Sequence, residues 1–191
     1  ANLNSLVDHR VIEALYAASQ AGVPIEILAR GICCLRPGVP GLSETIRVTS
    51  IVDRFLEHSR IFVFGVGDDA KVFLSSGDWM PRNFFRRVEV MFPILSADLR
   101  ERVLEEIIPT YLSDTARARR LDAKGVYHLP RPRNGDEPLR SQIEFLTRVA
   151  QQSQSTVTLP ESKKTKNPMQ RRTGHSQTRR AAKRSRKSGK K

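Results

Sequence analysis

The sequence LEHSRIFVFGVGDDAKVFLSSGDWMPRNFFRRVE, residues 56–89, sets the expected fold. Two short apolar segments within it, residues 61–64 and 71–75, flank the turn sequence GVGDD at 65–69. β-Branched and aromatic residues on both sides of a Gly/Asp turn are typical of a β-hairpin. We therefore expect an antiparallel pair of strands here, followed by a helix that starts at Pro81.

This hairpin would bring a histidine and several arginines together at one edge of a sheet. His58 precedes the first strand, and Arg82, Arg86 and Arg87 follow the second. A histidine beside guanidinium groups suits the binding and transfer of a phosphoryl group, because arginine pairs with phosphate oxygens and imidazole exchanges protons. His58 is the candidate reactive group. A second interpretation stays open, in which His58 only ends a helix and interacts with its dipole.

The rest of the chain alternates between helical and strand patterns. Helical spacing predicts helices over residues 5–22, 43–58, 96–109, 115–121 and 139–150. Short apolar segments predict further strands over residues 25–29, 88–92 and 126–129. Helices interleaved with strands indicate an α/β fold with a mixed sheet.

Two arginines differ from the others by their position. Arg30 ends the predicted strand 25–29, and a loop with three glycines and two prolines follows over residues 31–41. Loops at the carboxyl ends of strands in open α/β sheets are where ligands usually bind. Arg87 stands at the start of the predicted strand 88–92. We expect the fold to hold both guanidinium groups at a binding edge.

The strong positive charge of the chain, +13 at pH 7, comes almost wholly from its end. Residues 161–191 contain 13 lysines and arginines and one acid, Glu161, so the first 160 residues are nearly neutral. From about residue 151 large apolar side chains are almost absent, which predicts disorder. We expect a folded domain over residues 1–150 and a basic tail over 151–191. The tail either binds polyanions in a salt-dependent way or acts only as a solubilising extension.

Several patterns bear on where the protein works. Cys33 and Cys34 are adjacent, which is unfavourable for a structural disulfide, and no spaced set of Cys and His predicts a zinc site. No stretch approaches the roughly 18 apolar residues that a membrane helix needs, and no signal-peptide pattern opens the chain. We expect a cytoplasmic protein. Because the chain starts at Ala1 and enters a helix signal at once, we also expect a piece of a longer chain.

Five segments of the sequence resemble the C-terminal part of bacterial polyphosphate kinase, the type that works through a phosphohistidine. They occur in the same order and are NSLVD (4–8), ALYAASQAGV (14–23), RGICCLRPG (30–38), FLEHSR (55–60) and LSSGDWMPRN (74–83). The resemblance runs from about residue 2 to about residue 146 and excludes the basic tail. It implies a phospholipase D-like α/β/α sandwich. It also implies reversible transfer of the γ-phosphate of ATP to inorganic polyphosphate.

The same resemblance implies roles for three residues. Arg30 and His58 correspond to contacts with nucleotide phosphate, His58 also to a proton donor or second catalytic histidine, and Arg87 to a further phosphate ligand. ATP or ADP and polyphosphate are the implied substrates, and Mg²⁺ is the implied cofactor, with its ligands outside this chain. The family's phosphorylated histidine belongs to the preceding domain. The chain would therefore be a fragment, half of a split enzyme or a decayed copy, completed by a missing N-terminal half or a homo-oligomer.

Two charged residues depart from the pattern of the phospholipase D superfamily, His-x-Lys followed by Gly-Ser-x-Asn. This chain has His58-Ser59-Arg60 and Ser75-Ser76-Gly77-Asp78. Arginine for lysine and aspartate for asparagine weaken the case for phosphodiester hydrolysis with His58 as the nucleophile. That reaction remains an alternative, as does a non-catalytic domain that binds polyphosphate or nucleic acid.

Overall fold

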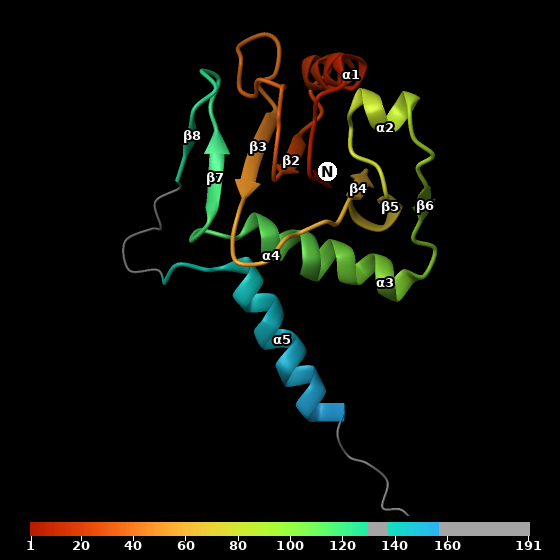
Figure 1. The fold of residues 1–191 in the computed structure, drawn as a ribbon, viewed down its shortest axis with the longest axis vertical. Coiled ribbons are helices and arrows are strands. Elements are labelled where there is room, and N and C mark those ends of the chain that lie inside the picture. Colours follow the sequence, from red (N-terminus) through yellow and green to blue (C-terminus); the bar gives the residue numbers. More distant parts are fainter. Residues whose placement is uncertain (130–136, 157–191) are drawn as a thin grey trace, which may run out of the picture. The chain divides into compact units, whose positions relative to one another are not determined.

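The computed structural model of the chain describes residues 1–129 and 137–156, except for the side chains of residues 68 and 154–156. Within them, one sheet has the strand order β6-β5-β4-β1-β2-β3-β7-β8 (Figure 1). The strands are β1 (Asn2–Leu3), β2 (Ile25–Ala29), β3 (Ile46–Ile51), β4 (Ile61–Phe64), β5 (Lys71–Ser75), β6 (Met91–Pro93), β7 (Ala118–Leu121) and β8 (Tyr127–His128). The pairs β1–β2 and β2–β3 are parallel, and the other pairs are antiparallel. The predicted α/β fold with a mixed sheet is confirmed.

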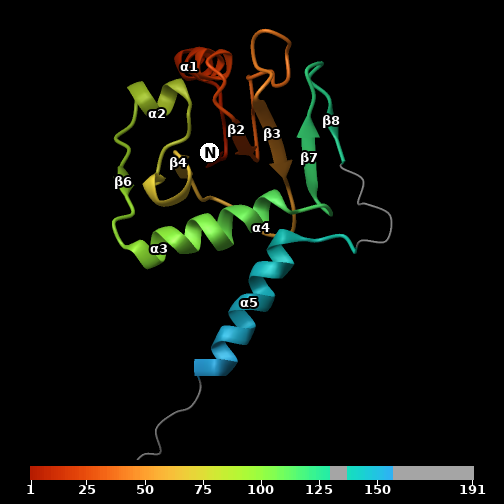
Figure 2. The same cartoon turned by 180° about the vertical axis from the view of Figure 1, so that it is seen from behind.

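The helices cover both sides of this sheet. They are α1 (His9–Gln20), α2 (Pro81–Phe85), α3 (Ala97–Glu101), α4 (Ile108–Leu112) and α5 (Ser141–Thr156). A π-helical turn, Arg102–Ile107, joins α3 to α4, so the helix predicted over residues 96–109 continues past Pro109. In both views α1 and α2 lie on one side of the strands, and α3 and α4 lie on the other (Figures 1 and 2).

Alternating strand residues fill two cores. Ile27 of β2 and Phe62 of β4 are buried in the core that α1 covers. Their neighbours along the chain, Leu28 and Ile61, point to the opposite face and join the clusters that contain Tyr111 of α4 and residues of the π-helical turn. Both faces of the sheet are therefore covered, as in the predicted α/β/α sandwich.

The predicted hairpin is present as β4 and β5. Its register pairs Ile61 with Leu74 and Phe64 with Lys71. Gly65 begins the turn with a φ of 92°, a conformation that side-chain-bearing residues rarely adopt. Helix α2 starts at Pro81 as predicted. Helix α1 starts later than predicted, because the carboxylate of Asp8, rather than Ser5, accepts from the first backbone N–H groups.

The helix predicted over residues 43–58 is wrong. Residues 46–51 form strand β3, which pairs in parallel with β2, and residues 52–60 form neither helix nor strand. Ile46 and Val48 are buried while Arg47 between them is exposed, which is the alternation of a strand. The spacing of the apolar residues fits both structures, and the β-branched content of IRVTSI favours the strand.

The short helix predicted over residues 115–121 is also wrong. Residues 118–121 form strand β7, which extends the sheet beyond β3. Oδ1 of Asp114 accepts hydrogen bonds from the N–H groups of Ala116, Arg117 and Ala118, at 3.0, 2.7 and 3.1 Å. These bonds hold the backbone in a turn that leads into a strand, because the carboxylate takes donors that a helix would use internally.

The last described helix, α5, ends at Thr156, six residues beyond the boundary predicted at residue 150. Residues 157–191 lie outside the described residues, so the predicted disorder of the basic tail stays a prediction. In the part of the chain that the structure covers, no helix combines the length and hydropathy needed to cross a membrane.

Candidate functional site

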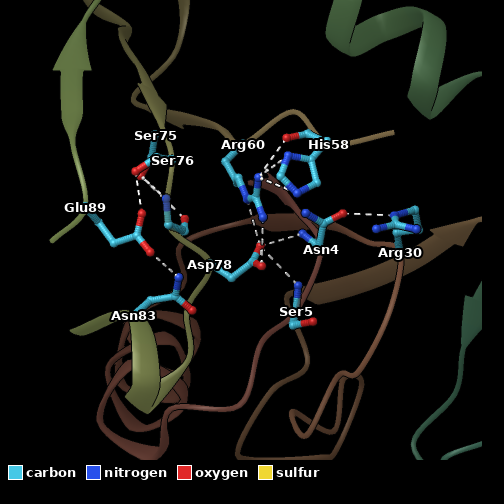
Figure 3. A network of polar contacts seen from close by, with 11 residues as sticks. Asn4, Ser5, Arg30, His58, Arg60, Ser75, Ser76, Asp78, Asn83 and Glu89 are labelled. Carbon is cyan, nitrogen blue, oxygen red and sulfur yellow. Dashed lines mark hydrogen bonds and ion pairs between the residues drawn. The ribbon is translucent and has the colours of Figure 1, made fainter. Parts of the chain in front are cut away.

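The candidate site is built around a buried ion pair between Arg60 and Asp78, which precede β4 and follow β5 (Figure 3). Nε and Nη2 of Arg60 donate to the two carboxylate oxygens of Asp78 at 3.1 and 3.0 Å. The side chains are only 8% and 5% exposed. The backbone N–H groups of Asn4 and Ser5 donate to Oδ1 of Asp78 at 2.8 and 3.3 Å. These contacts fix both planar groups and tie the hairpin to the end of β1.

The protonation of Asp78 reflects two opposing effects. Burial on its own would raise the pKa of this carboxyl group. The hydrogen bonds and charge of Arg60, together with the N–H groups of Asn4 and Ser5, outweigh burial, so the pKa of Asp78 lies below its ordinary value. The pair is therefore ionised at neutral pH.

Arg60 also holds His58. Nη1 of Arg60 donates to the backbone carbonyl of His58 at 2.9 Å, and it lies 2.8 Å from Nδ1 and 3.3 Å from Nε2 of the ring. A donor that close to both nitrogens lies over the face of the ring, because an in-plane donor to Nδ1 would be much farther from Nε2. Nη1 of Arg60 thus lies over the imidazole and sets its orientation, while the side chain of His58 remains exposed. Since residues 52–60 are not helical, the interpretation of His58 as a helix end is wrong.

Arg30 enters the same network through Asn4. Its Nε donates to Oδ1 of Asn4 at 2.9 Å, and its position after β2 is the one predicted. Asn4 therefore binds Arg30 through its side chain and Asp78 through its backbone N–H. The structure brings Arg30 and His58 into one network of contacts, connected by Asn4, Asp78 and Arg60 (Figure 3).

Arg87 lies outside that network, in the irregular segment between α2 and β6 rather than at the start of a strand. Its side chain is exposed. A neighbouring cluster surrounds Glu89, which accepts hydrogen bonds from the hydroxyl of Ser76 and from Nδ2 of Asn83. These two bonds, followed by the charge of Arg87, hold the pKa of Glu89 below its ordinary value. Arg87 is thus close enough to act on the charge of Glu89, but it has no described contact with Arg30 or His58.

The turn after β5 lies close to the side chain of Glu89 at Gly77. A Cβ atom added at Gly77 would lie 3.0 Å from Cγ of Glu89. Nδ2 of Asn83, from α2, binds the same carboxylate at 2.5 Å, and the backbone N–H of Val90 donates to Oγ of Ser76 at 3.0 Å. The segment that carries Arg87 is therefore packed closely against the turn that carries Asp78.

The segment that carries His58 is held from the other side by α5. Gln142, 5% exposed, accepts a hydrogen bond from the backbone N–H of Phe55 at 2.8 Å and donates to the carbonyl of Phe55 at 2.9 Å. It also donates to Glu57 at 2.9 Å. The hydroxyl of Tyr111 contacts Glu57 and Ser59. Burial, followed by the contact with Glu57, raises the pKa of Tyr111, and the contact with Ser59 partly opposes this. We call Gln142, Phe55 and Glu57 the loop clamp.

The donors around His58 suit an anion rather than a metal ion. Guanidinium and amide N–H groups bind phosphate oxygens, whereas Mg²⁺ requires oxygen ligands. Asp78, the carboxylate nearest His58 in the network, already accepts from four N–H groups. Among the described residues, no group of three or more His, Cys, Asp or Glu side chains could hold a metal ion. The arrangement therefore does not fit Mg²⁺, and we derive no step through it.

Three members of the network were not among the predicted site residues: Asn4, Arg60 and Asp78. Two of them are visible in the sequence as departures from a known pattern. Arg60 and Asp78 are the two charged departures from the superfamily pattern, and they have opposite charges. In the structure these departures are a single feature, because the arginine and the aspartate pair with each other. No signal in the sequence pointed to Asn4, whose role depends on a contact between β1 and β2.

Comparison with known proteins relates the chain to one family. The family model for polyphosphate kinase C-terminal domain 2 matches residues 1–142. A polyphosphate kinase of Rhodopirellula baltica is 48% identical over 162 residues, which cover 85% of this chain and 19% of that protein. A polyphosphate kinase of Halalkalibacterium halodurans is 50% identical over 155 residues, which cover 81% of this chain and 22% of that protein.

A solved structure shows the same fold. The crystal structure of polyphosphate kinase from Porphyromonas gingivalis matches with a TM-score of 0.74 and 39% sequence identity. The match covers 81% of this chain and 24% of that chain, so this chain spans only about a quarter of the solved protein and about a fifth of the curated relatives. From the family model, the relatives and the shared fold together, we conclude that this chain belongs to the polyphosphate kinase family.

Proposed function

We propose that this chain is the phosphate-binding half of the active site of a polyphosphate kinase, which moves the γ-phosphate of ATP reversibly to inorganic polyphosphate. The observation that carries the proposal is the network in which Arg60 holds the ring of His58 while Asn4 holds Arg30 (Figure 3). A fixed imidazole near a fixed guanidinium is an arrangement that binds a phosphoryl group and supplies a proton.

In this proposal Arg30 neutralises oxygens of the transferred phosphoryl group. The bond between the γ-phosphorus and the bridging oxygen of ATP breaks, and a bond forms to a nucleophilic histidine that lies outside this chain. His58 donates a proton or hydrogen bond to the oxygen that leaves. Arg87, exposed beside the site, contacts a more distant phosphate of ATP or of the polyphosphate chain. Mg²⁺ would be bound by residues outside this chain.

The role of His58 is tested in a full-length polyphosphate kinase that carries this domain. We expect His58→Ala to reduce ATP-dependent polyphosphate synthesis by roughly 100-fold or more, because it removes the proton donor. His128→Ala is the matched control: His128 is an exposed histidine on β8, paired with Asp122 at 2.7 Å, and its loss should leave synthesis unchanged. Unchanged turnover in the His58 variant, with folding verified by circular dichroism, would show that His58 has no such role.

The contacts of Arg60 disfavour the phosphodiesterase alternative. The residue at the superfamily's lysine position is Arg60, and its Nε and Nη2 are bound to Asp78 while Nη1 is bound to His58. It is therefore committed to positioning other residues rather than to binding a substrate phosphate. Cleavage of a phosphodiester by this chain alone, with a phosphohistidine trapped on His58, would favour the alternative.

Two further parts of the proposal concern the whole protein. Its substrates are ATP or ADP and polyphosphate, and its place of action is the cytoplasm. The rest of the active site is supplied by the remainder of a longer kinase chain or by a second copy in a homo-oligomer. To test the non-catalytic alternative, this chain is combined with a polyphosphate kinase that lacks this domain. Binding of polyphosphate without any turnover would favour a domain that only binds polyanions.

A further inference from the structure

Two buried side-chain amides next to the proposed phosphate site have N–H groups without a hydrogen-bond acceptor among the described residues. The side chains of Asn2 and Asn4 are 9% and 8% exposed, and Nδ2 of each is buried without a hydrogen-bond partner among the described residues. Residues two apart in an extended segment point to the same face, so both amides face the same side of the sheet. A buried N–H without a partner costs free energy, and such a group in a native protein calls for an explanation.

Both amides line a small pocket beside Arg30. Its remaining walls include Glu57, Ser59 and Tyr111, from the segment before β4 and from α4. The cavity volume is about 20 Å³, which is enough for one group of the size of a water molecule. A single oxygen atom of a bound phosphoryl group has this size.

Asn4 has the position that a phosphate ligand needs. In Figure 3 its amide group lies between Arg30 and His58, with the carbonyl oxygen turned toward Arg30 and the nitrogen turned away from it. The oxygen accepts from Nε of Arg30 at 2.9 Å, which leaves the two N–H donors of Nδ2 unused. One side chain thus orients the guanidinium group and presents donors of its own beside it.

We propose that Asn4 is a direct phosphate ligand, whose Nδ2 donates to an oxygen of the phosphoryl group bound between Arg30 and His58. This inference rests on the proposed function, since it names a further residue of the same site. The amide supplies a neutral donor of fixed orientation, and Arg30 supplies the charge. Together they bind two oxygens of one phosphoryl group, because the bond from Nε of Arg30 to Oδ1 of Asn4 fixes the orientation of both side chains.

The carboxylate in the pocket does not oppose this arrangement. Oε1 of Glu57 accepts from Nε2 of Gln142 at 2.9 Å, and the hydroxyl of Tyr111 also contacts Glu57. These contacts engage the carboxylate with Gln142 of α5 and Tyr111 of α4, so it is already bound by donors other than Asn2, Asn4 and Arg30. The pocket therefore has a donor side, formed by Asn2, Asn4 and Arg30, on which an anion can bind.

NMR can detect the contact between Asn4 and a phosphate oxygen in the unmodified protein. In the 191-residue chain, the side-chain N–H resonances of Asn4 are followed by NMR while inorganic pyrophosphate is added. We expect saturable shifts of these resonances together with those of the Arg30 guanidinium group. Shifts confined to Arg30, with the Asn4 amide unaffected, would overturn the proposal. Because the readout is specific to Asn4, binding of pyrophosphate to the basic tail does not affect it.

Variants of Asn4 test whether its side chain binds phosphate directly or only positions Arg30. Asn4→Asp keeps an oxygen for Nε of Arg30 but removes the N–H donors. Pyrophosphate binding at the site, measured from the NMR shifts of His58 so that the tail does not contribute, should weaken roughly 10- to 100-fold. Because the new carboxylate also places a negative charge beside Arg30, a loss of affinity supports the proposal only together with the shift of the Asn4 resonances in the wild type. Wild-type affinity in Asn4→Asp, with a loss only in Asn4→Ala, would show that Asn4 merely supports Arg30. Gln20→Glu, the same amide-to-acid change on the exposed face of α1, controls for net charge and should bind normally. Thermal unfolding of each variant shows whether it is folded.

The same measurements distinguish a failure of the proposed function from a failure of the proposed role of Asn4. If Arg30→Ala and Asn4→Asp both bind pyrophosphate as tightly as the wild type, no phosphate site exists here and both proposals fall. If Arg30→Ala loses binding while Asn4→Asp keeps it and the Asn4 resonances stay unshifted, the phosphate site stands and only the role of Asn4 is overturned.

Discussion

Arg60 and Asp78 show how one buried ion pair can serve both stability and position. With 8% and 5% of their side chains exposed, the two groups have exchanged water almost entirely for each other and for nearby N–H groups. Such pairs add little net stability compared with apolar residues, but the loss of one partner is costly because the other charge stays buried. The pair thus acts mainly as a fixed support for His58.

We predict that Asp78→Asn lowers the free energy of unfolding by about 3 kcal/mol, because it leaves Arg60 without a counter-charge. Urea denaturation at pH 7 measures this loss. The double variant Arg60→Met/Asp78→Leu, which removes both charges, should recover part of it. Equal losses in the single and double variants would mean that packing, and not the unpaired charge, sets the cost.

The same pair predicts a dependence on acid. The pKa of Asp78 is lower in the folded protein than in the unfolded chain, so the folded state holds its proton less tightly. Its stabilisation is therefore fully present above the unfolded value near 4 and is lost as the pH falls through the folded value. Urea midpoints between pH 5 and pH 2.5 should fall more steeply for the wild type than for the double variant. Parallel curves would contradict this assignment.

The residues of the site were only partly predictable. Arg30 and His58 stood out because one ends a strand at a glycine and the other precedes a hairpin. Asn4 did not, because its side chain gains a role only when β1 lies beside β2, a long-range pairing that local patterns do not encode. Arg60 and Asp78 were visible as departures from a pattern, but their pairing depends on the closure of the hairpin between them.

At the scale of elements, helix α5 acts on the site through the loop clamp. Gln142 of α5 forms hydrogen bonds both with the backbone of Phe55 and with the side chain of Glu57. This contact joins segments that are 87 residues apart in the chain. The irregular loop that carries His58 therefore owes its conformation to a helix near the other end of the described domain.

We expect Gln142→Ala to loosen that loop. The variant loses three hydrogen bonds and should be less stable by about 2 kcal/mol. Hydrogen exchange at the amide of Phe55 should become faster, since that N–H loses its acceptor. Thr147→Ala, on the exposed face of the same helix, is the control and should leave exchange at Phe55 unchanged. Unaltered exchange in the Gln142 variant would show that the loop is held by other contacts.

Strand β1 leads to a second prediction about an element. The Ala1 amine donates to the carbonyl of Glu26 at 2.8 Å, and burial lowers its pKa from 8.0 to about 6, with Glu26 partly opposing the shift. Between these values the unfolded chain binds more protons than the folded one. The stability of a chain that begins at Ala1 should therefore fall by about 2 kcal/mol as the pH drops from 8 to 6.

Acetylation of the Ala1 amine provides the comparison. The acetylated chain has no amine to titrate, so its stability should change less between pH 8 and pH 6. Thermal denaturation of both forms at several pH values measures the difference. If both forms lose stability equally, other groups, such as the histidines, cause the loss.

Elements were predicted well where periodicity and turn signals agreed. The hairpin of β4 and β5 has β-rich segments and a glycine turn that point to the same structure. The apolar residues of 46–51 fit both helical and strand spacing, so their spacing predicts a helix where the structure has strand β3. β7 was missed because ARRL has little apolar content. Its strand conformation comes from pairing with β3 and from the turn at Asp114.

At the scale of the whole molecule, charge divides the chain into two parts. Deleting residues 161–191 removes 13 lysines and arginines and one acid, and lowers the net charge from +13 to +1. We predict that the full chain binds polyphosphate with an affinity that falls steeply with salt, and that the deletion removes most of this affinity at low salt. Titration with polyphosphate at several salt concentrations tests this prediction. Equal binding by both chains at low salt would refute it.

The central position of β1 in the sheet affects how the chain folds during translation. Although it is the first strand of this chain, β1 lies between β2 and β4, and its Asn2 pairs with Ile61. During translation at about 5 to 20 residues per second, β1 would wait roughly 3 to 12 seconds for β4 to emerge. Asp78, which binds the N–H groups of Asn4 and Ser5, emerges later still. Until then the ribosome-bound chain exposes an unpaired edge at the centre of its future sheet, which is where a chaperone would be expected to bind it.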